Sequence, residues 1–343
     1  MEQALKEESE KLARSWMQHD AVRLRDYLVA GVEDPRWNLQ SIFSRHFLIR
    51  ALSGERFAGL MEEEYRFAAV MNWLLQWQRN LGHPEEVDLV AYALGRGADN
   101  VEGIEIPRFL VQTFGRLPME VDSFEVPNYI AQFLAAAASR AGQVEIDGAS
   151  GNAFQSLWPA ALSGLGLESK PSVLEPACGS ANDYRFVRSY GIARWLDYTG
   201  IDLCEKNIEN ARSLLSDVRF QVGNVFEIAA ADKSVDWLYV HDLFEHLSAA
   251  GLQRAVAEVC RVTRRGLCLG FFNMDEVPEH IMQPLDEYHW NVLSVAQMKE
   301  AFAGQGFATQ VLHAGSFLRQ RIGCEFTHNP NAYTLVLRAS GGA

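Results

Sequence analysis

The sequence predicts an α/β fold, with a mostly parallel sheet whose last strand is antiparallel and an all-helical part before it. From Ser172 onward, apolar segments of strand length alternate with segments of helix length, which is typical of a parallel sheet covered on both faces. The preceding residues instead repeat apolar positions at the helical spacing. The last two strand-like segments have only a loop between them, around Gly323 to Asn331, so we expect them to form a hairpin.

The N-terminal part is predicted to be helical throughout. The expected helices are Leu5 to Val29, one opened by Asp34-Pro35, Phe57 to Leu81, Asp88 to Leu94, Ile106 to Phe114 and Val126 to Ala141. Residues 143–169, with Phe154 and Trp158, are interpreted as the link to the second part. We therefore expect two domains, residues 1–142 as a helical cap or dimerisation domain and residues 143–343 as the domain that holds the site.

The second part is predicted to alternate strands and helices. The expected strands are 172–177, 197–203, 218–224, 234–241, 266–273, 307–313 and 332–338. The expected helices are 183–190, 205–215, 248–263 and 294–304. In open α/β sheets, ligands bind at the carboxyl ends of the strands, so that edge is where we look for function.

Composition excludes several classes of protein. The 343 residues carry a net charge of −13, which argues against an electrostatic hold on nucleic acid or on an anionic membrane. No apolar run is long enough to span a bilayer, and the N-terminus lacks the apolar core of a signal peptide. Five cysteines are scattered without C-x-x-C pairing. We expect a reduced, cytoplasmic protein that forms a homodimer.

The segment Glu175-Pro-Ala-Cys-Gly179 ends the first predicted strand in a turn of small residues. Gly179 lacks a Cβ, so a ligand can approach the backbone, and the helix that starts near Asp183 points its N–H groups at the turn. Asp202 ends the next strand, where an acid can hold ribose hydroxyls. The alternative is a plain strand-to-helix turn, with Asp202 as a helix cap.

Two further strand ends carry polar side chains. Asn224 follows a glycine and precedes Val225, so its amide can bond the amino edge of an adenine, or else form a simple Asx turn. His241, Asp242, Glu245 and His246 cluster after a buried strand. We expect His241 to face the ligand as general base, with Asp242 or the later His289 as the second choice. Glu245 and His246 are interpreted as a structural pair that caps the next helix.

Together these motifs resemble those of class I S-adenosylmethionine-dependent methyltransferases, which have a Rossmann-like sheet. The resemblance covers about residues 150–340. It implies that Glu175, Ala177, Gly179 and Asp183 surround the methionine part of the cofactor and that Asp202 binds the ribose. It also implies that Leu203 and Val225 enclose the adenine, that Asn224 reads its amino group and that His241 faces the cofactor. The chain departs from the family pattern at Ala177 and Ala181, where glycines are usual, and at Asn224, where an Asp is more usual.

We therefore predict methyl transfer from S-adenosylmethionine to a small-molecule acceptor, of the kind found in specialised metabolism, without a metal. One alternative is a divalent-metal-assisted methyltransferase, because Asp242, Glu245, His246 and His289 are similar to the metal-binding set of some relatives. A nicotinamide-dependent dehydrogenase is a second alternative, although the turn lacks G-x-G-x-x-G. A third is a non-catalytic protein that binds the cofactor and mediates interactions.

Overall fold

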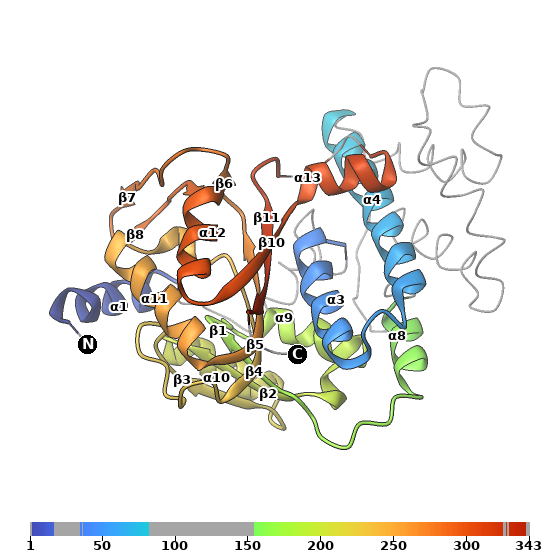
Figure 1. Ribbon diagram of the computed structural model, residues 1–343, viewed down its shortest axis with the longest axis horizontal. Helices are drawn as coiled ribbons and strands as arrows, with labels where there is room; N and C mark the ends of the chain where they lie inside the picture. The colour runs from blue at the N-terminus through green and yellow to red at the C-terminus, as the bar shows by residue number, and fades with distance from the viewer. Residues whose placement is uncertain are drawn as a thin grey trace.

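The computed structural model describes residues 2–16, 35, 37–81, 154–324, 327 and 329–340, of which 70–81, 155 and 156 are described by their backbone alone. At its centre is a seven-stranded sheet in the order β10-β11-β5-β4-β1-β2-β3, shown in Figure 1. Every neighbouring pair is parallel except those of β11, which runs antiparallel to β10 and β5. This confirms the predicted sheet.

All seven predicted strands are present. They are β1 (Ser172–Pro176), β2 (Asp197–Asp202), β3 (Arg219–Val222), β4 (Val235–His241), β5 (Thr263–Phe271), β10 (Phe307–His313) and β11 (Tyr333–Ala339). β4 lies between β1 and β5 and is buried from Asp236 to Val240, as expected of a strand covered on both faces. The hairpin of β10 and β11 differs from the prediction in its connection. A short helix, α13 (Ala314–Phe317), continues there as the π-helical turn Leu318–Ile322.

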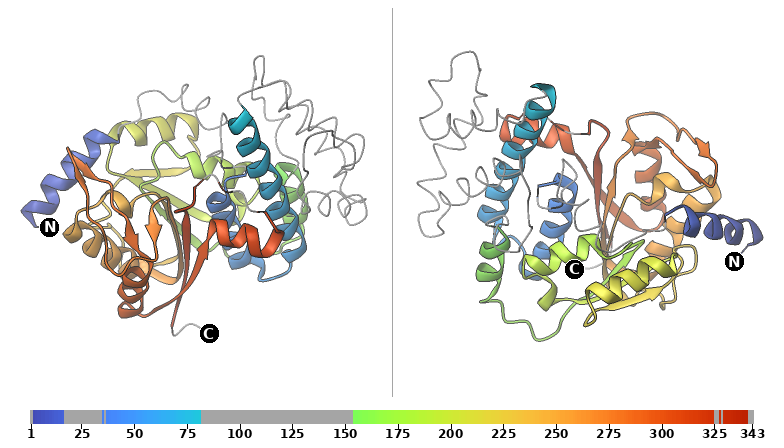
Figure 2. Two further views of the ribbon diagram at one scale, coloured as in Figure 1. Left: turned by 90° about the horizontal axis from the view of Figure 1, so that it is seen from above. Right: turned by 180° about the vertical axis from the view of Figure 1, so that it is seen from behind.

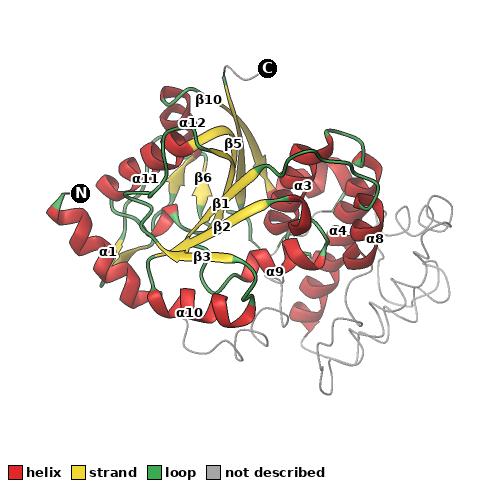
Figure 3. Cartoon of the chain, turned by 90° about the horizontal axis from the view of Figure 1, so that it is seen from below, coloured by secondary structure: helices red, strands yellow, loops and turns green. Residues whose placement is uncertain are grey.

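Helices cover both faces of the sheet, as Figure 3 shows. The four predicted in the second part are α9 (Asn182–Ser189), α10 (Glu205–Leu214), α11 (Ala249–Val262) and α12 (Val295–Gly304). One apolar core lies between the sheet, α11 and α12. The other lies between the opposite face and α9, α10, α3 (Leu39–Ser53) and α8 (Phe154–Leu162). Both cores are continuous with the sheet, so α3 and α8 belong to the sheet's own covering layer.

The N-terminal helices depart from the prediction in their bounds. The helix that we expected to open at Asp34-Pro35, α3, begins at Leu39, because the Asn38 side chain accepts hydrogen bonds from the backbone N–H groups of Gln40 and Ser41. α4 (Ala58–Leu81) is confirmed. The predicted link contains a helix, α8, whose Phe154 packs on Phe67 of α4. The predicted helices Asp88 to Leu94, Ile106 to Phe114 and Val126 to Ala141, and the boundary at residue 142, lie outside the described residues.

The first helix, α1 (Gln3–Ser15), is described only as far as Trp16 of the predicted Leu5 to Val29. It lies on the other side of the sheet from α3, α4 and α8, as Figure 2 shows. Glu8 joins it to α11: its carboxylate accepts hydrogen bonds from the backbone N–H and hydroxyl of Ser248, at 2.7 and 2.6 Å. A Cβ on Gly251 would lie 2.6 Å from that carboxylate, so glycine permits this approach.

Two small sheets, which the sequence does not predict, lie beside the carboxyl edge of the main sheet. They pair β6 (Met274–Asp275) with β9 (Leu293–Ser294), and β7 (Pro284–Leu285) with β8 (Tyr288–His289). All five cysteines are free thiols and buried. Among the described helices, no stretch is both long and apolar enough to cross a bilayer.

Candidate functional site

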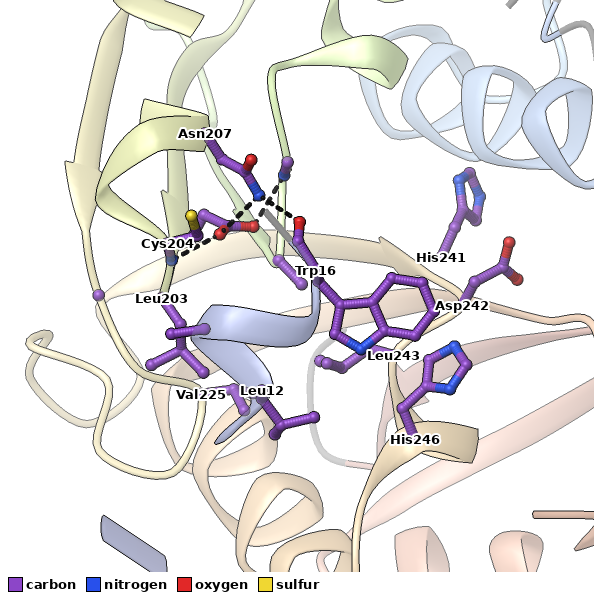
Figure 4. Close-up of a pocket in the computed structure, with 15 residues that line it drawn as sticks. Leu12, Trp16, Leu203, Cys204, Asn207, Val225, His241, Asp242, Leu243 and His246 are labelled. Atoms are coloured by element: carbon purple, nitrogen blue, oxygen red, sulfur yellow. Dashed lines mark hydrogen bonds between the residues drawn. The ribbon is translucent and has the colours of Figure 1, made fainter. Parts of the chain in front are cut away.

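A cavity of about 170 Å³ opens at the carboxyl ends of β1, β2 and β4. Figure 4 shows side chains from these three strand ends and from α1 converging on it. Of the predicted site residues, Ala177, Gly179, Asp202, Leu203, Val225, His241 and Asp242 line it. Glu175, Asp183, Asn224 and His289 do not.

The turn after β1 has a left-handed backbone at three alternate residues. The φ angles are 55° at Ala177, 53° at Gly179 and 68° at Ala181. A non-glycine residue in this region costs of order 1–3 kcal/mol and persists only where the surroundings impose it. The two alanines therefore hold a backbone conformation that favours glycine, at the two positions where the resemblance led us to expect glycines.

Asp202 ties this turn to the end of β2. One carboxylate oxygen accepts the backbone N–H of Gly179 at 2.9 Å, and the other accepts the N–H of Cys204 at 2.8 Å and the amide of Asn207 at 3.2 Å. Burial raises the pKa of Asp202, although these donors oppose the rise. A carboxylate offers about four acceptor positions, so the oxygen facing Gly179 can still accept a hydroxyl from a ligand.

The predicted adenine pocket is only partly formed by the expected residues. Leu203 and Val225 both line the cavity. The Asn224 oxygen instead accepts the backbone N–H of Phe226 at 2.8 Å, and its amide donates to Ser9 of α1 at 2.8 Å. This is the Asx turn of the simpler interpretation, so the structure does not bring Asn224 into the cavity.

Glu175 lies beneath the turn and outside the cavity. It is buried and accepts hydrogen bonds from the hydroxyls of Tyr198 and Tyr239, at 2.5 and 2.6 Å. Burial, together with the nearby charge of Asp183, raises its pKa to about 8. Its contribution is therefore to hold the end of β1 in place through two tyrosines on neighbouring strands.

His241 is bound on both ring nitrogens. Its Nδ1–H donates to the carboxylate of Asp183 at 3.0 Å, and its Nε2–H donates to the hydroxyl of Ser44 on α3 at 2.6 Å. Burial lowers the pKa of His241, but the Asp183 carboxylate outweighs that effect and raises it to about 9. A Cβ on Gly270 would lie 2.3 Å from the ring, so that glycine makes room for it. The raised pKa of His241 favours the imidazolium form at neutral pH, which does not suit the general base expected from the sequence.

The alternative metal set does not come together. Glu245 is fully buried, accepts the backbone N–H of Asn273 and has its pKa raised to about 8 by burial and by Asp242. Asp242 is exposed on the cavity wall, with a left-handed φ of 51°. His289 contributes its carbonyl oxygen to the site and not its ring. Within the described residues, no group of three or more His, Cys, Asp or Glu side chains is arranged to hold a metal ion.

His246, interpreted from sequence as structural, lines the cavity with a neutral ring. Its Nδ1–H donates to the carbonyl oxygen of His289 at 3.1 Å, and burial lowers its pKa below the usual value. With the proton on Nδ1, Nε2 carries a lone pair, and it has no hydrogen-bond partner among the described residues. Four aromatic rings surround it: Trp16, Phe272, Tyr288 and Trp290, with centroids 4.4 to 5.7 Å away.

Sequence reasoning also missed α1 as part of the site. Leu12, Ala13 and Trp16 line the cavity, and the carbonyl oxygen of Trp16 accepts the amide of Asn207 at 3.2 Å. In Figure 4 the Trp16 ring lies between Asn207 and His246. The only sequence signal is the amphipathic pattern of α1, which predicts a buried face and not the surface it covers.

A family model described as a methyltransferase domain matches residues 174–269. No curated protein matches the chain. Among solved structures, it is similar to the PH0226 protein of Pyrococcus horikoshii OT3, with 19% identity over 54% of this chain and 88% of that one and a TM-score of 0.37. It is also similar to an S-adenosylmethionine-dependent methyltransferase of Mesorhizobium loti, with 16% identity over 53% of this chain and 96% of that one and a TM-score of 0.37. A third similar structure is a complex between the Haloferax volcanii methyltransferase activator Trm112 and a methyltransferase. The identity is 15% over 55% of this chain and 90% of that one, and the TM-score is 0.38. These likenesses are too distant to indicate a substrate. The domain match confirms the resemblance to class I methyltransferases.

Proposed function

We propose that this chain, which contains a class I methyltransferase domain, transfers a methyl group from S-adenosylmethionine to the hydroxyl of an aromatic small molecule. The observation that carries the proposal is a single cavity that joins the cofactor turn, with Gly179 and Asp202, to the free imidazole nitrogen of His246. The domain match at residues 174–269 supports the reaction class.

The residues on one side of the cavity fit the cofactor. Gly179 brings backbone close to the ligand, Asp202 has an acceptor position for a ribose hydroxyl, and Leu203 and Val225 offer apolar surfaces for adenine. The positive charge favoured on His241, on the same wall, is paired with the Asp183 carboxylate at 3.0 Å. When bound, S-adenosylmethionine supplies a methyl group on a sulfonium sulfur, which leaves as a neutral thioether. At about 170 Å³ the cavity is below the usual 300–1,000 Å³ of ligand sites, so Trp16 must withdraw to admit it.

His246 replaces His241 as our choice of general base. A base must accept a proton, and both nitrogens of His241 already donate. His246 presents a bare Nε2, while the His289 carbonyl fixes its tautomer by accepting the Nδ1 proton. Nε2 would accept the hydroxyl proton as the acceptor oxygen gains the methyl group. The acceptor then ends as a neutral ether, and the positive charge lost by the sulfonium ends on the His246 imidazolium.

The surroundings of His246 favour an aromatic acceptor. The exposed large apolar residues of the described chain are Trp16, Val222, Ile281, Leu285 and Trp290. Of these, Trp16 and Trp290 contact the His246 ring, and Ile281 and Leu285 belong to the same small-sheet region. Among them only Trp16 lines the cavity, and the others lie beside it. Exposed apolar surface next to a cavity indicates ligand binding, and planar rings stack well on aromatic surfaces.

The test begins with calorimetry of S-adenosylmethionine and its demethylated product, followed by mass detection of methylated products. Acceptors would be matched phenols, such as catechol, and aliphatic diols of similar size. We expect cofactor binding and transfer to phenols only. Asp202→Asn, which keeps the shape of the side chain, is the matched variant for cofactor binding. Absence of cofactor binding in wild-type protein would disprove the proposal.

The remaining alternatives have their own results in the same experiments. Binding of NADH in place of S-adenosylmethionine would favour the dehydrogenase. Loss of turnover on chelation, with recovery on adding Mg²⁺, would favour the metal-assisted reaction through Asp242, Glu245, His246 and His289. Cofactor binding with no transfer to any acceptor would favour the non-catalytic protein.

A further inference from the structure

A second and larger cavity, of about 540 Å³, lies on the face of the sheet that α3 covers. Figure 1 shows the elements that enclose it, with α3 and α4 facing β10, β11 and α13. Its lining residues are Phe43, Phe47, Arg50, Glu55, Tyr65, Ala308, Thr309, Gln310, Leu312, Phe317, Arg321, Val336 and Arg338. None of them lines the cavity at the strand ends.

The charge of this cavity is opposite to that of the protein. Three arginines and one glutamate line it, in a chain whose net charge is −13. Arg50 pairs with Glu55 at 3.0 Å, and Arg321 pairs with Glu62 at 2.7 Å. The cavity therefore keeps an excess of positive charge, which favours an anionic ligand.

Arg338 is the arginine whose charge is not balanced. Among the described residues, no carboxylate lies within ion-pair distance of its guanidinium. The guanidinium instead stacks over the rings of Phe47 and Trp237, 5.2 and 4.8 Å from their centroids. Burial lowers its pKa, and the like charge of Arg50 lowers it further. Two neighbouring guanidinium groups in this arrangement are stabilised by an anion bound between them.

The rest of the wall is aromatic. Phe43, Tyr65 and Phe317 contact one another edge to face, with centroids 4.7 to 5.8 Å apart. The hydroxyl oxygen of Thr309 is buried and has no hydrogen-bond partner within the described part of the chain. Buried polar atoms are nearly always satisfied, so this one is available to a bound ligand.

We propose that this cavity binds a small carboxylate with an aromatic or apolar body. The carboxylate would accept from Arg50 and Arg338, and the body would lie against the rings of Phe43, Phe47 and Tyr65. Inorganic phosphate meets only the first requirement, because it leaves the aromatic wall uncovered. The volume of about 540 Å³ is within the usual range for small ligands. The proposal is independent of the methyl acceptor, which binds at the other cavity.

α3 joins the two cavities. Phe43, Phe47 and Arg50 lie on the side of the helix that faces the second cavity, whereas Ser44 accepts the hydrogen bond from His241. A ligand that fixes α3 would therefore also fix the hydroxyl that holds the His241 ring. Binding of the carboxylate could in this way affect the position of the His241 side chain.

The experiment is calorimetric titration of the full chain with benzoate, benzamide and inorganic phosphate. We expect benzoate to bind with an affinity of about millimolar, as suits so small a ligand, and benzamide and phosphate to bind at least tenfold more weakly. Arg338→Gln should weaken benzoate roughly tenfold or more, through loss of a charge-assisted hydrogen bond. Arg50→Gln, made in parallel, should do the same, and thermal melting would check that both variants fold.

Asp202→Asn is the matched control, because it lies in the other cavity and should leave benzoate binding unchanged. Absence of benzoate binding in wild-type protein would overturn the proposal. So would equal binding of benzamide, equal binding of phosphate, or full benzoate affinity in both arginine variants.

Discussion

The two sides of the cavity, which we propose hold the cofactor and the methyl acceptor, each contain a histidine, and the two histidines have opposite surroundings. On the cofactor side, His241 is protonated and bound on both nitrogens, to Asp183 and Ser44. On the acceptor side, His246 is neutral, bound on one nitrogen and surrounded by rings. His241 is the last residue of β4, and His246 follows it by five positions.

The difference shows that burial alone does not decide the state of a histidine. Burial lowers the pKa of both rings. For His241 the adjacent carboxylate reverses the effect, whereas His246 has only a carbonyl oxygen as its partner. His241 is therefore held in place in a form that favours positive charge, whereas His246 keeps a nitrogen that can accept a proton, as the proposed reaction requires.

The largest effect is expected at His246. His246→Gln keeps a polar side chain of similar length but removes the basic nitrogen, so turnover should fall roughly 100- to 10,000-fold. Cofactor affinity should change little, because the side chain lies on the acceptor side. Steady-state kinetics with a phenol and calorimetry with S-adenosylmethionine would measure the two quantities.

His313→Gln is the matched control for that variant. His313 also donates to a backbone carbonyl, that of Pro330, and stacks on a ring, that of Tyr333, but it does not line the cavity. The activity of the His313→Gln variant should stay near that of the wild type. If the His246 variant kept full turnover, His246 would not be the base, and the contrast between the two histidines would have no catalytic meaning.

The second effect concerns stability and tests the charge on His241. Its pKa rises from 6.5 to about 9 on folding. This stabilisation is worth about 3 kcal/mol, at 1.36 kcal/mol per pKa unit. It is fully present below pH 6.5 and is lost as the pH rises through about 9. Glu175 and Glu245 also have raised pKa values, of about 8. Their contribution to folding stability is lost as the pH rises through about 8, before that of His241 is lost.

Urea unfolding between pH 8 and 9.5 should therefore show wild-type stability falling with pH. Asp183→Asn removes the carboxylate that raises the pKa of His241, so the variant should lose most of this slope. An unchanged slope would mean that His241 is not protonated at neutral pH, and it would again be available as a base.

The sequence predicted the sheet, and the position of Gly179 and Asp202 at its carboxyl edge, because both depend on local pattern. Seven apolar runs and four helices follow from periodicity, and Gly179 and Asp202 lie at strand ends, where the position of a side chain follows from the strand itself. Ala177 and Ala181 did not obscure the turn, since both have the left-handed backbone that Gly179 has.

The acceptor side could not be predicted because it depends on contacts between distant segments. The state of His241 is set by Asp183 and by Ser44 of α3, and that of His246 by the backbone of His289. The side chain of Asn224 is bound by the backbone N–H of Phe226 and by Ser9 of α1, and the second of these contacts could not be seen in the sequence. Periodicity shows that α1 has a buried face, but it does not show what that face covers.

The third prediction tests the cofactor side. Asp202→Asn removes the negative charge while the amide oxygen can still accept from Gly179. Its NH2 group then faces the Cys204 N–H and the Asn207 amide, so thermal melting must accompany the binding measurement. Loss of a charge-assisted hydrogen bond to a ribose hydroxyl should weaken S-adenosylmethionine by about 1.5–3 kcal/mol. Calorimetry measures this directly, and turnover at saturating cofactor should stay near wild type. Wild-type affinity in the variant would remove Asp202 from the cofactor site.

The smallest effect is expected at Trp16, which lies between the two sides. The centroid of its ring lies 4.4 Å from that of His246. Its carbonyl oxygen accepts a hydrogen bond from the amide of Asn207, which also donates to Asp202. Trp16→Ala empties part of the cavity but leaves that backbone contact in place. S-adenosylmethionine should then associate faster, by less than about tenfold, because less aromatic contact must be broken before entry.

Stopped-flow fluorescence would measure the association rate, with Trp290→Ala as the control, since Trp290 contacts His246 but does not line the cavity. If Trp16→Ala instead slowed association, Trp16 would be part of the binding surface and not an obstacle to it. The two sides would then act as one site that α1 completes.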